Sequence, residues 1–303
     1  MQDKIQTIHK TVLLQETIYG LNLSGQSPVV LDATFGGGGH SELVFSKFPK
    51  AKIIALDQDK GAFERAEHKF KNYKSQISFV NINFRDLDKA LENEGIQKVD
   101  GIIFDLGLSS DQLDNSLRGF SFMRDEPLHM TMKENPSRED LTAGDVVNGW
   151  SEENLANIIY GYGEERFSRR IAKAIVDARE QREIKTTFEL VKIISDAVPS
   201  LYRRGRLHFA TRTFQAIRIA VNDELGALEM GLRKGFEAIR EGGRMSVISF
   251  HSLEDRITKK FFNELKIEGK CKVISKKPIT ASPEEIRDNP RSRSAKLRII
   301  EKI

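Results

Sequence analysis

The fold of this 303-residue chain can be traced from Val29-Val30-Leu31-Asp32-Ala33-Thr34-Phe35-Gly36-Gly37-Gly38-Gly39-His40. The first six residues form a short β-branched and apolar run, which is typical of a buried parallel strand. The four glycines that follow let the backbone turn sharply and approach a ligand without interference from a Cβ atom. In doubly wound sheets, a strand that leads through such a loop into a helix is where nucleotides bind. The segment therefore predicts an α/β fold with a nucleotide-type ligand at this loop.

Strands and helices alternate after the loop. Two stretches of helical character follow, at 40–48 and 60–70. Short apolar runs typical of buried strands lie at 52–57, 77–81, 99–105 and 243–249. Strands that alternate with helices predict a parallel sheet covered on both faces.

The alternation stops after Asp105 for about 130 residues. Apolar residues recur at helical spacing within this interval, which indicates at least three amphipathic helices, near 155–159, 171–178 and 190–194. Beyond it we expect one more helix at 253–265 and strands near 272–275 and 297–300. The sequence thus predicts an α/β doubly wound core formed by 1–112 and 213–303, with a helical insertion at 113–212.

The composition is that of a soluble globular protein, with 39% apolar and 30% charged residues. No apolar run approaches the roughly 20 residues that span a bilayer, and the polar start Met1–Lys10 lacks the apolar stretch of a secretion signal. We therefore expect a cytoplasmic protein that does not bind a membrane. The single cysteine, Cys271, permits no internal disulfide, and no second His or Cys stands at metal-ligand spacing from His40. We expect no metal.

Asp57 ends the second predicted strand, about 20 residues after the glycines. An acidic side chain there can accept hydrogen bonds from ribose hydroxyls, so the pattern indicates a cofactor that contains adenosine. The dinucleotide fingerprint is incomplete, because Ser41 or Glu42 occupies the position of its third small residue. No Gly-Lys-Ser/Thr follows the loop either, and this excludes an ATPase phosphate loop. At the helix start, His40 is expected to pack and to contact the cofactor through its backbone.

The insertion is strongly basic, although the whole chain has a formal charge of only +4. Residues 166–212 hold 12 Lys and Arg against 5 Asp and Glu. Four basic residues stand at the i, i+3, i+4 and i+7 spacing of one helix face: Arg166, Arg169, Arg170 and Lys173. Such a stripe suits contacts with nucleic-acid phosphates. The alternative interpretation is a solvated helix face.

Several long motifs resemble the bacterial 16S rRNA cytosine-4-amino methyltransferase family, in order and with appropriate spacing over nearly the whole chain. They are 32–41, 105–113, 118–124, 161–167, 210–219 and 249–256. The resemblance implies a Rossmann-like methyltransferase sheet, S-adenosyl-L-methionine as the cofactor, and methylation of a decoding-site cytidine on its exocyclic amine. The implied partner is 16S rRNA within the small ribosomal subunit, bound by the insertion, with Arg212 and Arg218 as further RNA-contact candidates.

By the same resemblance, the cofactor-binding residues are Gly38, Gly39, His40, Asp57, Phe84, Asp105 and Gln112. Phe84 follows the third predicted strand, and its ring could stack on adenine or could simply belong to the core. Asp105 and His251 are the candidate catalytic residues, because each follows a strand at the ligand edge of the predicted sheet. Asp105 could instead serve only the cofactor, and His251 could instead be a structural residue.

Three departures from related patterns bear on these roles. His129 stands where the family usually has Asp, and His208-Phe209 replaces a usual His-Pro. Asp105-Leu106-Gly107-Leu108 also differs from the Pro-Pro-aromatic segment of other amino methyltransferases. The proton acceptor is therefore left open. So are two other classes of function: a non-catalytic rRNA-binding or assembly factor, and a nicotinamide-dependent oxidoreductase, which Ser41 and Glu42 disfavour.

Overall fold

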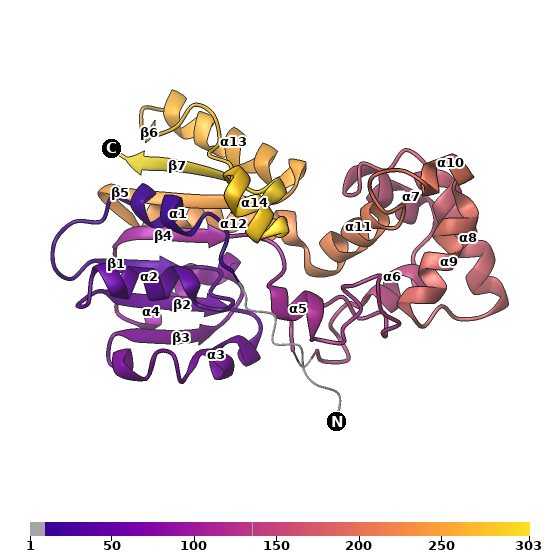
Figure 1. Cartoon of the computed structure of the whole chain (residues 1–303), viewed down its shortest axis with the longest axis horizontal. Coiled ribbons are helices and arrows are strands. Elements are labelled where there is room, and N and C mark those ends of the chain that lie inside the picture. Colours follow the sequence, from indigo (N-terminus) through magenta and orange to yellow (C-terminus); the bar gives the residue numbers. More distant parts are fainter. Residues whose placement is uncertain (1–9, 135) are drawn as a thin grey trace. The chain divides into compact units, whose positions relative to one another are not determined.

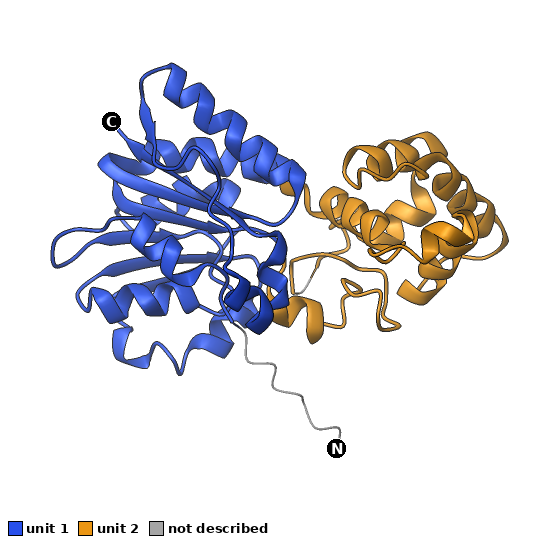
Figure 2. Ribbon diagram, turned by 45° about the horizontal axis from the view of Figure 1, so that its top comes forward, with its two compact units in different colours: residues 1–107, 225–303 blue, residues 108–224 orange. Residues whose placement is uncertain are grey.

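The computed structural model describes residues 10–134 and 136–303, which form two compact units (Figure 2). The first unit comprises the described residues up to Gly107 together with Leu225–Ile303, and the second comprises Leu108–Glu224. Most of the polar start, Met1–Lys10, lies outside the described residues. Within the described part of the chain, no helix is both long and apolar enough to cross a membrane.

The first unit contains a seven-stranded sheet with the order β3-β2-β1-β4-β5-β7-β6 (Figure 1). Neighbouring strands from β3 to β5 are parallel, whereas β7 runs antiparallel to both β5 and β6. The α/β fold and the parallel pairing of the strands that alternate with helices are thus confirmed, and of the two late strands β7 alone runs opposite to the others. The strands are β1 (Val29–Asp32), β2 (Lys52–Asp57), β3 (Ile77–Asn81), β4 (Val99–Asp105), β5 (Ile239–Ser249), β6 (Cys271–Val273) and β7 (Lys296–Lys302).

Three of the central strands end in an aspartate. β1 lies between β2 and β4, so the order of strands reverses direction at β1. In the register, Asp32 is opposite Ala55 of β2 and Ile103 of β4, which places the carboxyl ends of the three strands at one edge. Ligands of doubly wound sheets bind outside this edge, where the strand order reverses.

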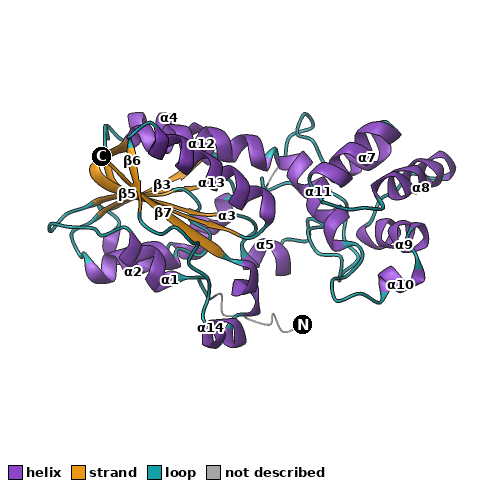
Figure 3. Cartoon of the chain, turned by 90° about the horizontal axis from the view of Figure 1, so that it is seen from above, coloured by secondary structure: helices purple, strands orange, loops and turns teal. Residues whose placement is uncertain are grey.

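Helices cover both faces of the sheet because its strands are apolar on both sides. One face packs on α4 (Leu87–Asn93), α12 (Glu224–Ala238) and α13 (Ser252–Ile267), and the other on α1 (Leu14–Gly20), α2 (Gly39–Lys47) and α3 (Lys60–Ala66). Neighbouring residues of one strand serve different faces, as Ile102 and Ile103 do. Figure 3 shows α4, α12 and α13 on the side of the sheet opposite α1 and α2. The short helix α14 (Pro283–Asp288) precedes β7.

The second unit is helical and has a hydrophobic core of its own. Leu155, Ile171 and Leu190 are fully buried in it, one from each of the three amphipathic stretches that the sequence predicts. Ser or Thr side chains cap the starts of four of its described helices, and Thr186 forms a capping box with Glu189. The helices are α5 (Ser110–Asp114), α6 (Ala143–Gly149), α7 (Glu152–Gly161), α8 (Ser168–Gln181), α9 (Thr187–Ala197), α10 (Ser200–Arg203) and α11 (Thr211–Asn222).

The second unit is longer at both ends than the expected insertion 113–212. Helix α11 belongs to it, because Phe214 and Ile217 of this helix are buried in the same core as residues of α6 and α7. At the other end, Leu108 and Leu113 pack against that core. Which core these residues join depends on packing between elements, and residue spacing does not determine it.

Candidate active site

The glycine-rich loop joins β1 to α2 in the first unit. Gly36 and Gly38 have φ angles of 51° and 70°, in the left-handed region that favours glycine. A Cβ on Gly38 would lie 2.6 Å from the ring of Phe35, and a Cβ on Gly39 would overlap the side chain of Thr11. The glycines are therefore required by the packing of the loop itself, in addition to any ligand that approaches it.

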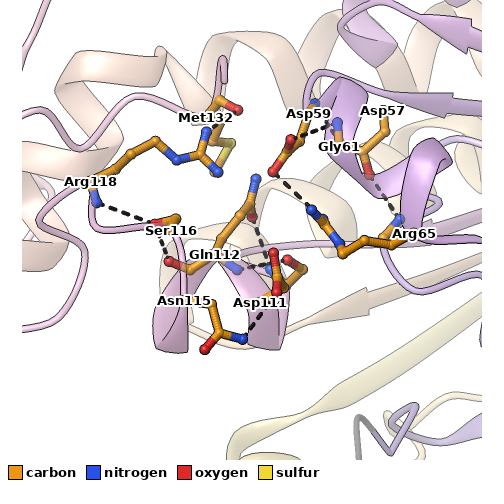
Figure 4. Close-up of polar contacts among 12 residues, drawn as sticks. Asp57, Asp59, Gly61, Arg65, Asp111, Gln112, Asn115, Ser116, Arg118 and Met132 are labelled. Atoms are coloured by element: carbon orange, nitrogen blue, oxygen red, sulfur yellow. Dashed lines mark hydrogen bonds and ion pairs between the residues drawn. The ribbon is translucent and has the colours of Figure 1, made fainter. Parts of the chain in front are cut away.

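Asp57 holds this loop at the end of β2. One carboxylate oxygen accepts the N–H of Gly36 at 2.8 Å, and the other accepts the N–H of Asp59 at 2.8 Å. Burial raises the pKa of Asp57 to about 6 against the opposing effect of these two hydrogen bonds. Each carboxylate oxygen has a second lone pair, so Asp57 can still accept a ribose hydroxyl. Figure 4 shows Asp57 beside Asp59, which caps α3 by accepting the N–H of Gly61.

Asp32, at the end of β1, is a site residue that the sequence interpretation missed. Its side chain is buried and accepts the Oγ–H of Ser41 at 2.7 Å and the N–H of Thr34 at 3.4 Å. Burial raises its pKa to about 6. Ser41, which interrupts the dinucleotide fingerprint, thus binds the strand-end carboxylate. A carboxylate followed nine residues later by a serine was the available signal.

Asp105 lies at the end of β4, beside the same loop. Its N–H donates to Oγ1 of Thr34 at 2.6 Å, and its Oδ2 lies 3.8 Å from Nδ1 of His40. Among the described residues, its Oδ1 is buried without a hydrogen-bond partner. Burial, with smaller contributions from the charges of Asp32 and Glu254, raises the pKa of Asp105 to about 8. The structure therefore brings Asp105 and His40 together and leaves one carboxylate oxygen for a ligand.

Phe84 follows β3 in the first turn of a short 3₁₀ helix, Phe84–Asp86. Its half-buried ring packs edge-on against Phe104, with centroids 5.6 Å apart. A Cβ on Gly231 of α12 would lie 2.7 Å from the same ring, so this glycine makes room for it. These contacts fix the orientation of the ring, and stacking on adenine stays a prediction.

Gln112 lies in the second unit, in α5. Its side chain closes a capping box in which Oε1 accepts the N–H of Ser109 at 3.0 Å and Oγ of Ser109 accepts the N–H of Gln112 at 3.1 Å. The adjoining loop is fixed by Arg118, whose guanidinium donates to the carbonyl of Met132 at 2.9 Å (Figure 4). Gln112 is thus held in one conformation, with its amide nitrogen outside the capping box.

His251 follows β5 and forms the N-cap of α13. Its Nδ1 accepts the N–H of Glu254 at 3.5 Å, and its Nε2 lies 3.2 Å from Oε1 of Glu254. The buried Glu254 in turn accepts the N–H groups of Phe250 and His251. These contacts favour a structural role for His251, and its catalytic role stays a prediction.

The basic residues of the insertion do not form one helical stripe. α8 begins at Ser168, so Arg166 lies before the helix, and the expected helical spacing holds only for Arg169, Arg170 and Lys173, which are exposed. The guanidinium of Arg166 lies 4.7 Å from the ring centre of Phe167 and 5.2 Å from that of Tyr202.

Three other basic side chains of this unit have intramolecular partners. Lys173 forms an ion pair with Asp177 at 3.0 Å, and Arg212 donates to the carbonyl of Glu164 at 2.9 Å. Arg218 is more fully engaged, because it forms a bidentate pair with Glu224 in which both N–O distances are 2.8 Å. This pairing favours a structural role for Arg218.

The fold and the site together define a class of protein. A sheet of this order, with a glycine-rich loop after β1 and acidic residues at the ends of β2 and β4, is that of a Rossmann-like, S-adenosylmethionine-dependent methyltransferase. More specifically, the chain matches the MraW methylase family over residues 6–303 and belongs to that family. This is the family of S-adenosylmethionine-dependent 16S rRNA cytosine-N4 methyltransferases. Its membership sets aside both the nicotinamide-dependent oxidoreductase and the non-catalytic factor.

Solved structures with a similar fold include other methyltransferases. An rRNA methylase from Streptococcus thermophilus has 9% sequence identity and a TM-score of 0.46, and the match covers 97% of this chain and 98% of that one. TrmN from Thermus thermophilus has 12% identity and a TM-score of 0.43, and the match covers 96% of this chain and 48% of that one. The assignment rests on the family and not on these distant likenesses.

Proposed function

We propose that this enzyme methylates the exocyclic 4-amino group of a cytidine in the decoding region of 16S rRNA, within the small ribosomal subunit in the cytoplasm. The observation that carries the proposal is Asp105, a strand-end carboxylate at the ligand edge of the sheet with one buried oxygen that lacks a hydrogen-bond partner among the described residues. Such an oxygen can accept an N–H of the cytosine amine. We further propose that the reaction needs no metal.

The cofactor, when bound, supplies a methyl group on a sulfonium, ready for in-line displacement. The residues proposed to hold it are the ones that the family resemblance implies: Gly38, Gly39, His40, Asp57, Phe84, Asp105 and Gln112. The first unit fits this role, because the loop bends back at Gly38 and Asp57 fixes it through Gly36. Gln112 belongs to the second unit, and its inclusion rests on the family resemblance alone.

The amine of cytosine is a poor nucleophile because its lone pair is delocalised into the ring. Two contributions from Asp105 address this difficulty. Its carboxylate holds the amine in line for attack, and positioning of this kind lowers the barrier. It also takes a proton from the amine as the new N–C bond forms. The ionised form of a carboxyl group with a pKa of about 8 is a far stronger base than an ordinary carboxylate, and its fraction increases as the pH rises toward 8, so turnover should increase over the same interval.

His40 positions this carboxylate. The ring is buried, and its Nδ1 lies 3.8 Å from Oδ2 of Asp105, which leaves Oδ1 as the oxygen that meets the amine. Thr34 fixes the backbone of Asp105 through a 2.6 Å hydrogen bond. The proposed catalytic group is therefore held by two residues of the cofactor loop.

The second unit is the proposed RNA-recognition domain. Arg166, Arg169, Arg170 and Lys173 are exposed, and the aromatic rings of Phe167 and Tyr202 hold the guanidinium of Arg166. The buried Glu165 supports this arrangement by accepting the N–H of Phe167 at 2.8 Å and the O–H of Tyr202. Arginines fixed on aromatic rings suit phosphate contacts, and Arg212 at the start of α11 extends the same set.

Incubation with methyl-labelled cofactor and unmethylated small ribosomal subunits tests the chemistry. We expect the label in a nucleoside with the mass and retention of 4-methylcytidine. A label in 5-methylcytidine, in a ribose methyl group or in no nucleoside would contradict the proposal.

A further inference from the structure

A short loop of the first unit, residues 289–295, lies at the same edge of the sheet as the cofactor loop. It joins α14 to β7, and the first residue of β7, Lys296, pairs with Ser249, the last residue of β5. Because β7 is antiparallel to β5, the start of β7 lies where the parallel strands end. Figure 1 shows α14, in yellow, at the end of the sheet to which β1 and β4 point.

The N-terminal segment 10–13 connects this loop to the cofactor loop. The side-chain amide of Asn289 donates to the carbonyl of Lys10 at 2.9 Å, and the carboxylate of Glu285 accepts the N–H of Leu13 at 2.8 Å. Between these anchors, Thr11 packs so closely on Gly39 that a Cβ there would overlap it. Segment 10–13 therefore contacts both loops.

Two arginines project from the loop, while polar residues between and before them are buried. Ser292 is fully buried, and its N–H and O–H both donate to the carbonyl of Asn289, at 2.9 and 2.8 Å. Arg291 and Arg293, on either side of Ser292, are exposed. Within the described residues, Arg293 has no ion-pair partner. The buried Ser292 and Asn289 thus hold the backbone in place between two exposed arginines.

The surroundings of the loop are positively charged. Residues 276–296 contain six Lys and Arg against three Asp and Glu. Each of the three acids already has a partner: Glu284 pairs with Arg287, Asp288 pairs with Lys10, and Glu285 accepts the N–H of Leu13. Lys276 and Lys277, both exposed, precede a bridge between Ile279 and Leu297 near the start of β7, so they add charge at this edge.

We propose that loop 289–295 is an RNA-binding element of the catalytic unit, in which Arg291 and Arg293 contact phosphates next to the target nucleotide. The inference rests on the proposed function and adds a second contact surface to it. Guanidinium groups bind phosphate oxygens in a bidentate manner, and a fixed backbone reduces the entropy lost on binding. The position of the loop beside the cofactor loop assigns it to RNA close to the methylated base.

The double variant R291Q/R293Q tests this element. Each phosphate contact that is lost lowers the salt dependence of RNA binding by about 0.7 to 0.9 in the slope of log K against log salt, so we expect a decrease of about 1.4 to 1.8. Cofactor affinity should be unchanged, because neither arginine is among the residues proposed to hold the cofactor. The matched control is K50Q/K266Q, which removes the same charge from exposed residues near the opposite edge of the sheet and should leave the slope unchanged.

Three results distinguish the possible failures. An unchanged slope in R291Q/R293Q, or an equal decrease in the control, overturns this inference while the proposed function stands. A wild-type enzyme that shows no salt-dependent binding to small-subunit RNA and no methyl transfer overturns both. If the double variant does not fold, as judged by its melting transition, R293Q alone should show half of the decrease. R291K/R293K, which keeps the charge, should retain most of the wild-type slope.

Discussion

Asp105 carries the proposed chemistry at the scale of single residues, and the Asp105→Asn variant tests its role. Asparagine keeps the shape of the side chain but cannot take up the proton. We expect turnover to fall by roughly 10² to 10⁴-fold, the usual contribution of a general base, with a much smaller loss of cofactor affinity. Single-turnover rates and calorimetric titration of the cofactor measure the two effects separately. If both decline in parallel, Asp105 is only a binding residue.

The buried carboxyl groups also predict how stability depends on pH. The pKa of Asp105 is raised from 3.8 to about 8, and those of Asp32 and Asp57 to about 6. Between these values and 3.8 the folded state binds more protons than the unfolded state, so the stability of the cofactor-free enzyme falls as the pH rises from about 4 to 8. Above pH 6, Asp105 is the main contributor of the three.

Denaturant unfolding of the wild type and of Asp105→Asn at pH 6 and pH 8.5 measures this effect. We expect the wild type to lose more stability than the variant over this interval, because asparagine does not titrate. Equal losses would mean that the carboxyl group of Asp105 is already ionised in the folded enzyme at pH 6.

Sequence reasoning identified Asp57 and Asp105 but not Asp32 or Thr34. Asp57 and Asp105 stand at the ends of apolar runs that predict strands, and ligands of doubly wound sheets bind at such strand ends. The roles of the other two depend on contacts across the loop, from Ser41 to Asp32 and from Asp105 to Thr34. Such contacts require the folded path of the chain, which residue spacing does not contain.

The cofactor loop is an element whose packing depends on Thr11, a residue that lies well before it in the sequence. Gly39→Ala would place a methyl group into the side chain of Thr11, so we expect a loss of stability of roughly 1 to 3 kcal/mol, the usual effect of overpacking, together with weaker cofactor binding. Thr11→Ala in the same chain should recover part of both losses. Melting and calorimetry check this, with Gly149→Ala as the control, because nothing lies near its added Cβ. No recovery in the double variant would contradict the steric explanation.

Helix α8 is the element that tests RNA recognition by the second unit. Replacement of Arg169 and Arg170 with Gln should lower the salt slope of RNA binding by about 0.7 to 0.9 per lost contact. Cofactor affinity should not change, because α8 and the glycine-rich loop belong to different units. The control replaces Lys71 and Lys74 of the first unit. An unchanged slope with full activity would show that this face of α8 is only solvated.

The elements themselves were predictable to different degrees. All seven strands follow from short apolar runs, and α7, α8 and α9 follow from the spacing of apolar residues. The antiparallel direction of β7 and the place of α11 in the second unit were not predictable, because the first depends on how β7 pairs with β5 and β6 and the second on which core the helix joins. The spacing of basic residues also did not show that α8 begins only at Ser168, after Arg166.

At the scale of the whole molecule, a cofactor-binding unit is combined with a basic helical unit. The first provides the sheet edge where Asp57 and Asp105 meet the glycine-rich loop, and the second carries the excess of positive charge between Arg166 and Arg212. A small-molecule methyltransferase would need only the first. The combination is what an enzyme requires when one base within a large, highly charged RNA is the substrate.

The position of the methyl group in the RNA tests the central claim most directly. Small subunits that lack the modification are treated with enzyme and methyl-labelled cofactor, and their 16S rRNA is then cut into fragments that are separated and identified by mass. We predict one labelled fragment, from the decoding region, with the methyl group on the 4-amino nitrogen of a cytidine. A label confined to other fragments, or spread over many of them, would contradict the account.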